Sequence, residues 1–171
     1  FLDVGANIGN HSVAVAKLRP DVTVIPIEAE PRAVRILKEN IALNRVRNVD
    51  TSYLGKALST GNGEILLQWA SSVSSTSVSP DQFGIRVPNL KLKDLVNGKM
   101  LVKLDIEGLE SDVIQDAKEV FDLHIPLLMV EMLSESEKNL LCSLERLGYE
   151  IKETFQMPAG KNIIAAKKAR T

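Results

Sequence analysis

The chain alternates short apolar or β-branched runs with longer segments of helical periodicity, and this alternation limits the folds that it can adopt. Five strands are expected at residues 1–4, 23–28, 49–54, 101–106 and 127–132. Four helices are expected at residues 10–18, 31–43, 109–121 and 134–147. Strands that alternate with helices predict a mostly parallel sheet, covered by helices on both faces and joined by right-handed crossovers.

The middle and the C-terminal end depart from this alternation. Residues 149–156 and 161–167 are extended segments on either side of the sequence MPAG, which predicts a hairpin and an antiparallel edge of the sheet. The sequence GNG at residues 61–63 predicts a turn. The serine-rich residues 71–79 are expected to form a solvated loop or a lid over a site.

Size, charge and cysteine content narrow the class of protein. With 171 residues, of which 44% are hydrophobic, we expect one domain over residues 1–171, and the start at Phe1 inside a strand predicts missing upstream sequence. A net charge of −1 is not typical of nucleic-acid binding, and no apolar run approaches the roughly 20 residues of a membrane span. The single cysteine, Cys142, excludes an internal disulfide and a cysteine-based zinc site, and it fits a cytoplasmic setting. The oligomeric state stays open.

A glycine-rich turn follows the first expected strand in the sequence FLDVGANIGNHS. Gly5 and Gly9 allow a ligand to approach the backbone closely, and the helix that follows offers free N–H groups to a negative group. A dinucleotide-binding turn reads G-x-G-x-x-G, whereas Asn7 stands here in place of the second glycine and would crowd a pyrophosphate. Glu28 ends the second expected strand, where a carboxylate can accept hydrogen bonds from both ribose hydroxyls of an adenosine.

This combination resembles the class I S-adenosylmethionine-dependent methyltransferases, and further stretches resemble the FkbM-type methyltransferase family. These stretches are PIEAEP, ILKENIALN, VKLDIEGLE, IPLLMVEM and LERLGYEI. The resemblance implies a three-layer Rossmann-like α/β fold with a mostly parallel seven-stranded sheet and an antiparallel C-terminal hairpin strand. It also implies S-adenosyl-L-methionine as the cofactor. The turn after the fourth strand lacks the Asn/Asp-Pro-Pro-Tyr sequence of amide and adenine N-methyltransferases, which favours a hydroxyl acceptor on a small molecule or sugar.

The resemblance also assigns residues to the cofactor. The expected cofactor-binding residues are Asp3, Gly5, Ala6, Asn7, Gly9, Glu28, Ala57 and Asp105. The turn from Asp3 to Gly9 matches the loop that holds the methionine portion, Glu28 matches the acid that holds the ribose, and Ala57 lies where such proteins approach the adenine.

Candidate catalytic residues are acids that could take the proton of a hydroxyl acceptor. We expect Asp105 near the cofactor and Glu107 or Glu131 near the acceptor, with His11 as a further candidate base. One of the acids after the fourth strand, which include Glu110, could instead cap a helix. Because a bound sulfonium already gives these acids a cationic partner, no metal site is expected.

Two other functions stay open from the sequence. The chain could be an NAD-type oxidoreductase on a similar sheet, or a non-catalytic binding domain that keeps the methyltransferase fold.

Two residues fit the expected strands poorly. Pro26 cannot donate a hydrogen bond within an interior strand, so a bulge is expected there, and Lys103 either pairs with a neighbouring acid or points to solvent.

Overall fold

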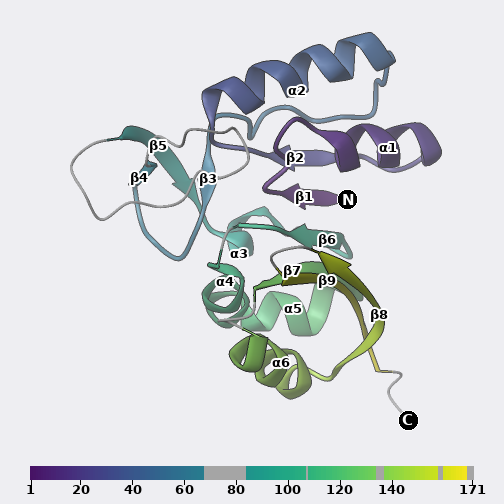
Figure 1. Cartoon of the computed structure of the whole chain (residues 1–171), viewed down its shortest axis with the longest axis vertical. Coiled ribbons are helices and arrows are strands. Elements are labelled where there is room, and N and C mark those ends of the chain that lie inside the picture. The colour runs from purple at the N-terminus through teal and green to yellow at the C-terminus, as the bar shows by residue number, and fades with distance from the viewer. Residues whose placement is uncertain (68–83, 107, 134–136, 158–159, 169–171) are drawn as a thin grey trace.

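A mixed six-stranded sheet forms the centre of this computed structural model, which describes residues 1–67, 84–106, 108–133, 137–157 and 160–168. The strand order is β2-β1-β6-β7-β9-β8 (Figure 1). The strands are β1 (Leu2–Val4), β2 (Ile25–Ile27), β6 (Leu101–Leu104), β7 (Leu127–Leu133), β8 (Tyr149–Met157) and β9 (Gly160–Lys167). The first four strands in this order pair in parallel, and β9 pairs antiparallel to both β7 and β8. The expected fold class, with its antiparallel C-terminal hairpin, is confirmed, but the described sheet has six strands where seven were expected.

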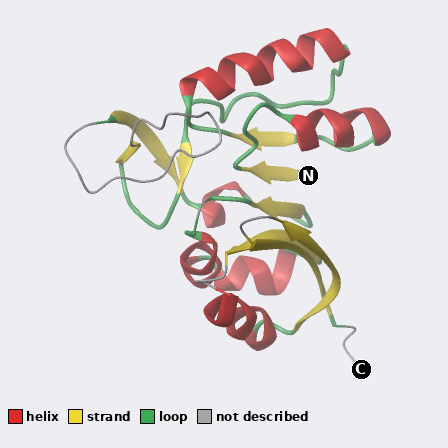
Figure 2. Ribbon diagram, viewed as in Figure 1, coloured by secondary structure: helices red, strands yellow, loops and turns green. Residues whose placement is uncertain are grey.

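Helices lie on both faces of the sheet (Figure 2). They are α1 (Asn10–Leu18), α2 (Pro31–Asn44), α3 (Leu92–Leu95), α4 (Glu110–Asp116), α5 (Lys118–His124) and α6 (Glu137–Arg146). The helix expected at 109–121 is therefore two helices, which meet at Ala117, where φ is −104° and ψ is 22°. Among the described helices, none has both the length and the apolar character that a membrane crossing requires.

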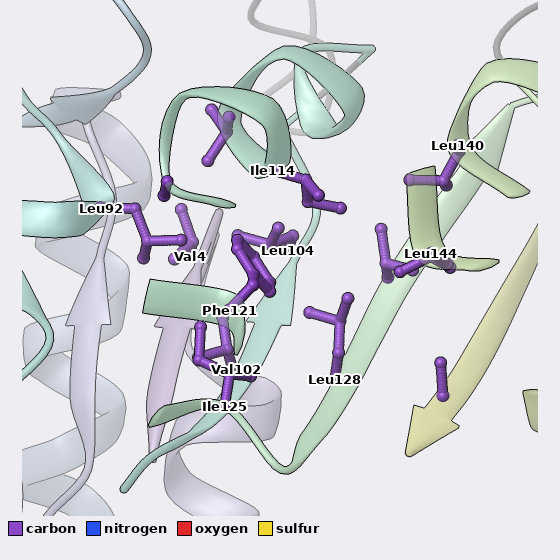
Figure 3. Close-up of a cluster of buried hydrophobic side chains, with 14 of the residues drawn as sticks. Val4, Leu92, Val102, Leu104, Ile114, Phe121, Ile125, Leu128, Leu140 and Leu144 are labelled. Carbon is purple, nitrogen blue, oxygen red and sulfur yellow. The ribbon is translucent and has the colours of Figure 1, made fainter. Parts of the chain in front are cut away.

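Alternation along the central strands assigns the helices to the two faces. Val4, Leu104 and Leu128 point into one core together with Ile114 and Phe121, on the face that α4, α5 and α6 cover (Figure 3). In each strand, the residues that alternate with these core residues point to the opposite face of the sheet. There the Ser12 hydroxyl of α1 donates to Asp3 Oδ2 at 2.6 Å. The three layers thus meet at the short strands β1 and β6.

The strand expected at 49–54 is reduced to two isolated bridges, Val24 to Val49 and Glu28 to Leu54. Pro26 explains the interruption between them. Ile25 donates to Phe1 on the β1 side, so the missing donor of Pro26 would point away from β1, toward residues 49–54. The expected bulge is wrong, because the described β1–β2 pairing continues through Pro26 without a shift.

A second, three-stranded sheet was not predicted from the sequence. It contains β3 (Ala57–Leu58), β4 (Glu64–Leu67) and β5 (Ile85–Leu90) in the order β3-β5-β4. In Figure 1 it lies on the side toward which the tips of β1 and β2 point. The serine-rich segment expected at 71–79 falls outside the described residues.

Candidate functional site

The strand order itself predicts a ligand-binding crevice at the carboxyl ends of β1 and β6. The chain runs from β1 to β2 on one side and returns later to β6 on the other side of β1. The helices that follow β1 and β6, α1 and α4, cover opposite faces of the sheet. In open α/β sheets, ligands bind outside the carboxyl ends of the strands at such a switch point.

The glycine turn after β1 is held in place by its neighbours on β2 and α2. The N–H groups of Gly5 and Ala6 both donate to the carbonyl of Ile27 at 3.0 Å. Asn40 of α2 donates its side-chain amide to the carbonyl of Ile8 at 2.8 Å. Asn7 has a φ of 50°, in the left-handed region that asparagine tolerates better than most residues. The turn is thus fixed from β2 and α2.

Both glycines of this turn are required by contacts within the protein. Gly5 has a φ of 71°, and a Cβ there would overlap the carbonyl oxygen of Asp105. At Gly9, with a φ of 85°, a Cβ would lie 2.8 Å from Leu37 Cγ. From the sequence, these glycines were expected to allow a ligand to approach the backbone. The structure shows instead that they allow β1 to lie against β6 and α1 against α2.

Gly9 is also the residue that precedes α1. Among the described residues, no side chain caps this helix, because glycine has none to offer. The first N–H groups of α1 therefore remain available to a negatively charged group, as the sequence predicts.

Glu28 lies at the carboxyl end of β2, and backbone N–H groups fix its orientation. Its Oε1 accepts from Ala29 at 2.9 Å and from Glu30 at 2.8 Å, and its Oε2 accepts from Asn7 at 2.7 Å. Burial raises the pKa of Glu28, while these hydrogen bonds oppose the rise. A carboxylate has about four acceptor positions, so Oε2 can still accept from a ligand hydroxyl. The residue is half-buried and is joined by the bond from Asn7 to the glycine turn.

A buried lysine connects the ends of β1 and β6. Lys103 Nζ lies 2.9 Å from Asp105 Oδ2, 3.2 Å from the carbonyl oxygen of Gly5 and 3.5 Å from Asp3 Oδ1. The side chains of Lys103 and Asp3 are 3% and 0% exposed, whereas that of Asp105 is 35% exposed. Of the two acids, Asp105 therefore faces the crevice, and Asp3 is a buried anchor.

The acidic turn after β6 is stabilised by Glu110, the first residue of α4. Glu110 Oε1 accepts from the N–H of Ile106 at 2.8 Å and from that of Gly108 at 3.3 Å. Burial, and to a lesser degree the negative charge of Asp105, raise the pKa of Glu110. Glu110 therefore holds the turn that precedes α4, and it does not cap the helix, because no side chain caps α4 among the described residues.

The remaining candidate residues are Glu107, Glu131 and His11. Glu107 falls outside the described residues. Glu131 is half-buried in β7 and directly follows Val130, which pairs with Leu104 of β6, so it lies in the strand next to Asp105. His11 is exposed in the first turn of α1.

Ala57 is buried in the three-stranded sheet, in a small apolar cluster with Leu67 and Val87. Ala29, the residue after Glu28, packs against this cluster, and the N–H of Gly55 donates to the carbonyl of Glu28 at 2.8 Å. The cluster around Ala57, which is expected to approach the adenine, is therefore joined to Glu28, the carboxylate that is expected to hold the ribose.

These groups fit an adenosine cofactor that carries an amino acid. In the described part of the chain, no donor contacts Asp105 Oδ1, so this oxygen of a partly exposed side chain is free to accept from an ammonium group. The uncapped N–H groups of α1 suit a carboxylate, and Glu28 suits a ribose. The described residues contain no group of three His, Cys, Asp or Glu side chains that could hold a metal ion.

Comparison with known proteins identifies the family. The family model described as "Methyltransferase FkbM domain" matches residues 3–151. No curated protein matches the chain.

Solved structures show the same fold at low sequence identity. A precorrin-6y C5,15-methyltransferase from Geobacter metallireducens has a TM-score of 0.63 at 16% identity, with 98% of this chain and 79% of that chain covered. A ribosomal protein L11 methylase from Lactobacillus delbrueckii has a TM-score of 0.59 at 15% identity, with 98% and 69% covered. Fibrillarin from Aeropyrum pernix, solved with natively bound S-adenosyl-L-methionine, has a TM-score of 0.56 at 14% identity, with 96% and 65% covered.

Proposed function

The chain belongs to the FkbM methyltransferase family, and on this basis we propose that it transfers a methyl group from S-adenosylmethionine to a hydroxyl of a small molecule or sugar. S-adenosylmethionine is the cofactor of this family. The observation that carries the proposal is the meeting of the glycine turn, Glu28 and Asp105 at the carboxyl ends of three adjacent strands, β1, β2 and β6.

Each part of the cofactor has a proposed partner in this crevice. The glycine turn and Asp105 Oδ1 hold the amino-acid end, and Glu28 accepts from the ribose hydroxyls. The cluster around Ala57 and Ala29 offers the adenine an apolar surface. The same arrangement leaves the region between Asp105 and Glu131 for the acceptor.

The chemistry requires alignment more than a strong base. The bound cofactor supplies a methyl group on a cationic sulfonium; the acceptor oxygen gains this methyl and loses its proton, and a neutral thioether leaves. Positioning of reactants contributes on the order of 7–11 kcal/mol to such reactions, whereas a general base contributes about 10²- to 10⁴-fold in rate. We assign the base to Glu107 or Glu131, with His11 as the other candidate.

The acceptor is proposed to be an oxygen because the turn after β6 is acidic and lacks the Asn/Asp-Pro-Pro-Tyr sequence. The solved relatives named above are described as acting on a precorrin and on a ribosomal protein, so the fold does not decide the acceptor. The variants Glu107→Gln and Glu131→Gln are both expected to keep the affinity for the cofactor. Whichever of these two residues is the base, its variant is expected to lose turnover.

We also propose a cytoplasmic location, as the single cysteine suggests.

Calorimetric titration of the chain with S-adenosylhomocysteine, with NAD in parallel, tests the cofactor site. We expect micromolar binding of S-adenosylhomocysteine and none of NAD. The Glu28→Gln variant is expected to bind about tenfold more weakly or worse, because it loses a charged acceptor for the ribose. Glu39→Gln, a change at an exposed position of α2, is the matched control and should bind as the unchanged chain does. Binding of NAD alone, or unchanged affinity in Glu28→Gln, would contradict the proposed site.

A further inference from the structure

Lys103 is an unusual residue for the middle of a parallel strand. Its side chain is only 3% exposed, although a lysine on a strand normally reaches solvent. Its ammonium donates to Asp105 Oδ2 and to the Gly5 carbonyl, and it forms an ion pair with Asp3 Oδ1 at 3.5 Å. All three partners belong to residues that the sequence assigns to the cofactor. A single buried side chain therefore connects two parts of the candidate site, the glycine turn after β1 and the end of β6.

We propose that Lys103 is a positioning residue that sets the affinity of the site for the amino-acid end of the cofactor. The inference rests on the proposed function. Lys103 is too deeply buried to touch a ligand, so it would act through Asp105 and Gly5.

The geometry around Asp105 explains how Lys103 can act at a distance. By binding Oδ2, Lys103 fixes the rotation of the Asp105 carboxylate and leaves Oδ1 as the oxygen that can accept from the ligand ammonium. By donating to the Gly5 carbonyl, it holds the glycine turn against the end of β6. The charge of Lys103 also separates the two carboxylates, Asp3 and Asp105. Without it the buried Asp3 and the partly exposed Asp105 would repel each other, and Asp105 would be free to rotate.

Glu28 does not contact Lys103 directly and is connected to it only through the glycine turn, in which Gly5 accepts from Lys103 and Asn7 donates to Glu28. Glu28 is held by the backbone N–H groups of Asn7, Ala29 and Glu30, and no bond between Glu28 and Lys103 is found among the described residues. A change at Lys103 is therefore expected to affect the amino-acid end of the ligand and to spare the adenosine end.

The test compares two ligands that differ in this one part. S-adenosylhomocysteine carries the amino-acid end, and 5′-methylthioadenosine lacks it. We would measure both dissociation constants by calorimetry for the unchanged chain and for Lys103→Met, Lys103→Arg and Lys161→Met. Lys161 is the matched control, since it is also a strand lysine paired with an acid, Glu137 at 2.8 Å, but lies in β9. Circular dichroism and urea unfolding establish that each variant is folded.

We expect Lys103→Met to bind S-adenosylhomocysteine at least about tenfold more weakly and 5′-methylthioadenosine within twofold of the unchanged chain. Lys103→Arg keeps the charge but moves the donors, so a smaller loss, confined to S-adenosylhomocysteine, is expected. Lys161→Met should change neither constant. If Lys103→Met does not fold, the ratio of the two constants in Lys103→Arg decides the question.

Equal losses for both ligands in a folded Lys103 variant would give Lys103 a merely structural role and overturn the inference. An unchanged ratio in Lys103→Arg, where only that variant folds, would also overturn it. If the unchanged chain binds neither ligand, the proposed function itself fails. Failure of the inference and failure of the proposed function therefore give different results.

Discussion

At Gly5 the backbone of β1 ends against the backbone of β6, and this contact decides which residue the position accepts. The φ of 71° already disfavours a side chain, and the carbonyl oxygen of Asp105 occupies the place of a Cβ. Gly55 has a similar φ of 83° but has no atom within 4 Å of a Cβ. The two glycines therefore separate the cost of the backbone conformation from the cost of the contact.

We expect Gly5→Ala to lower the free energy of unfolding by at least about 3 kcal/mol, since a displaced backbone adds to the cost of a positive φ. Gly55→Ala should cost only about 1–2 kcal/mol, the cost of the left-handed conformation alone. Urea unfolding of both variants without ligand measures the difference. Similar losses in the two variants would mean that the contact with Asp105 relaxes easily and does not explain the glycine.

Glu110 is a buried acid whose pKa is raised, and its effect on stability should depend on pH. A carboxyl whose pKa is higher in the folded than in the unfolded chain contributes stability that is fully present below its ordinary value of 4.5. This contribution is lost as the pH rises through the folded pKa. Glu110→Gln does not titrate, and its amide oxygen can still accept from Ile106 and Gly108.

The stability of Glu110→Gln relative to the unchanged chain is therefore expected to increase between pH 4 and pH 7.5. Urea unfolding at both pH values gives this difference, and Glu119→Gln, at an exposed position of α5, is the control whose relative stability should stay constant. A relative stability of Glu110→Gln that falls as the pH rises would show that the folded pKa of Glu110 is lowered instead.

At the scale of elements, Tyr149 joins the start of β8 to the end of α5. Its buried hydroxyl lies 3.2 Å from the carbonyl oxygen of Phe121 and also contacts that of Ile125, and burial raises the pKa of the phenol. These carbonyls belong to the end of a helix, where the helix itself offers no donors. The ring of Tyr149 also packs edge-on against Phe121.

We expect Tyr149→Phe to lower the free energy of unfolding by about 1–2 kcal/mol, because it leaves buried carbonyls without a donor. Tyr53→Phe is the control, since Tyr53 is only half-buried and its ring lies beside Lys56. This change should cost less than about 0.5 kcal/mol. A Tyr149→Phe variant as stable as the unchanged chain would mean that water replaces the hydroxyl.

The elements show what periodicity can and cannot predict. Residues 10–18 form α1 at the predicted bounds, because the glycine turn before it marks the start of that helix clearly, although its buried residues are only Ser12 and Ala16. The division of residues 109–121 into α4 and α5 was not predictable, since the apolar period continues across Ala117. β5 was missed because it contains Pro88 and polar residues, and its pairing partner β4 lies about 20 residues away along the chain.

The site follows the same division. Gly5 and Glu28 were placed correctly at strand ends, because local turn and strand signals identify such positions. The sequence did not decide whether Lys103 pairs with an acid or points to solvent. Its burial depends on Asp3 from β1 and on the Gly5 carbonyl, which are about 100 positions away in the sequence. The signal was its position between apolar residues, two residues before Asp105.

For the whole molecule, the proposed site joins three segments that are far apart in the sequence. The glycine turn, the end of β2 and the turn after β6 meet at the carboxyl ends of three adjacent strands. These strands lie at one end of the strand order, and β8 and β9 lie at the other end (Figure 1). A ligand that contacts all three segments must oppose their local opening together. Opening of the hairpin β8–β9 involves none of these groups.

Hydrogen exchange with and without saturating S-adenosylhomocysteine tests this arrangement. We expect slower amide exchange in peptides that cover residues 1–13, 25–34 and 104–113, and no change in peptides that cover residues 149–157. The end of β2 is the most informative segment, because it should be protected only if Glu28 and its turn take part in binding. Protection limited to β7, β8 and β9 would place the ligand on a different part of the sheet. Protection of the β1 and β6 turns without that of β2 would keep the amino-acid end at Asp105 and remove the ribose from Glu28.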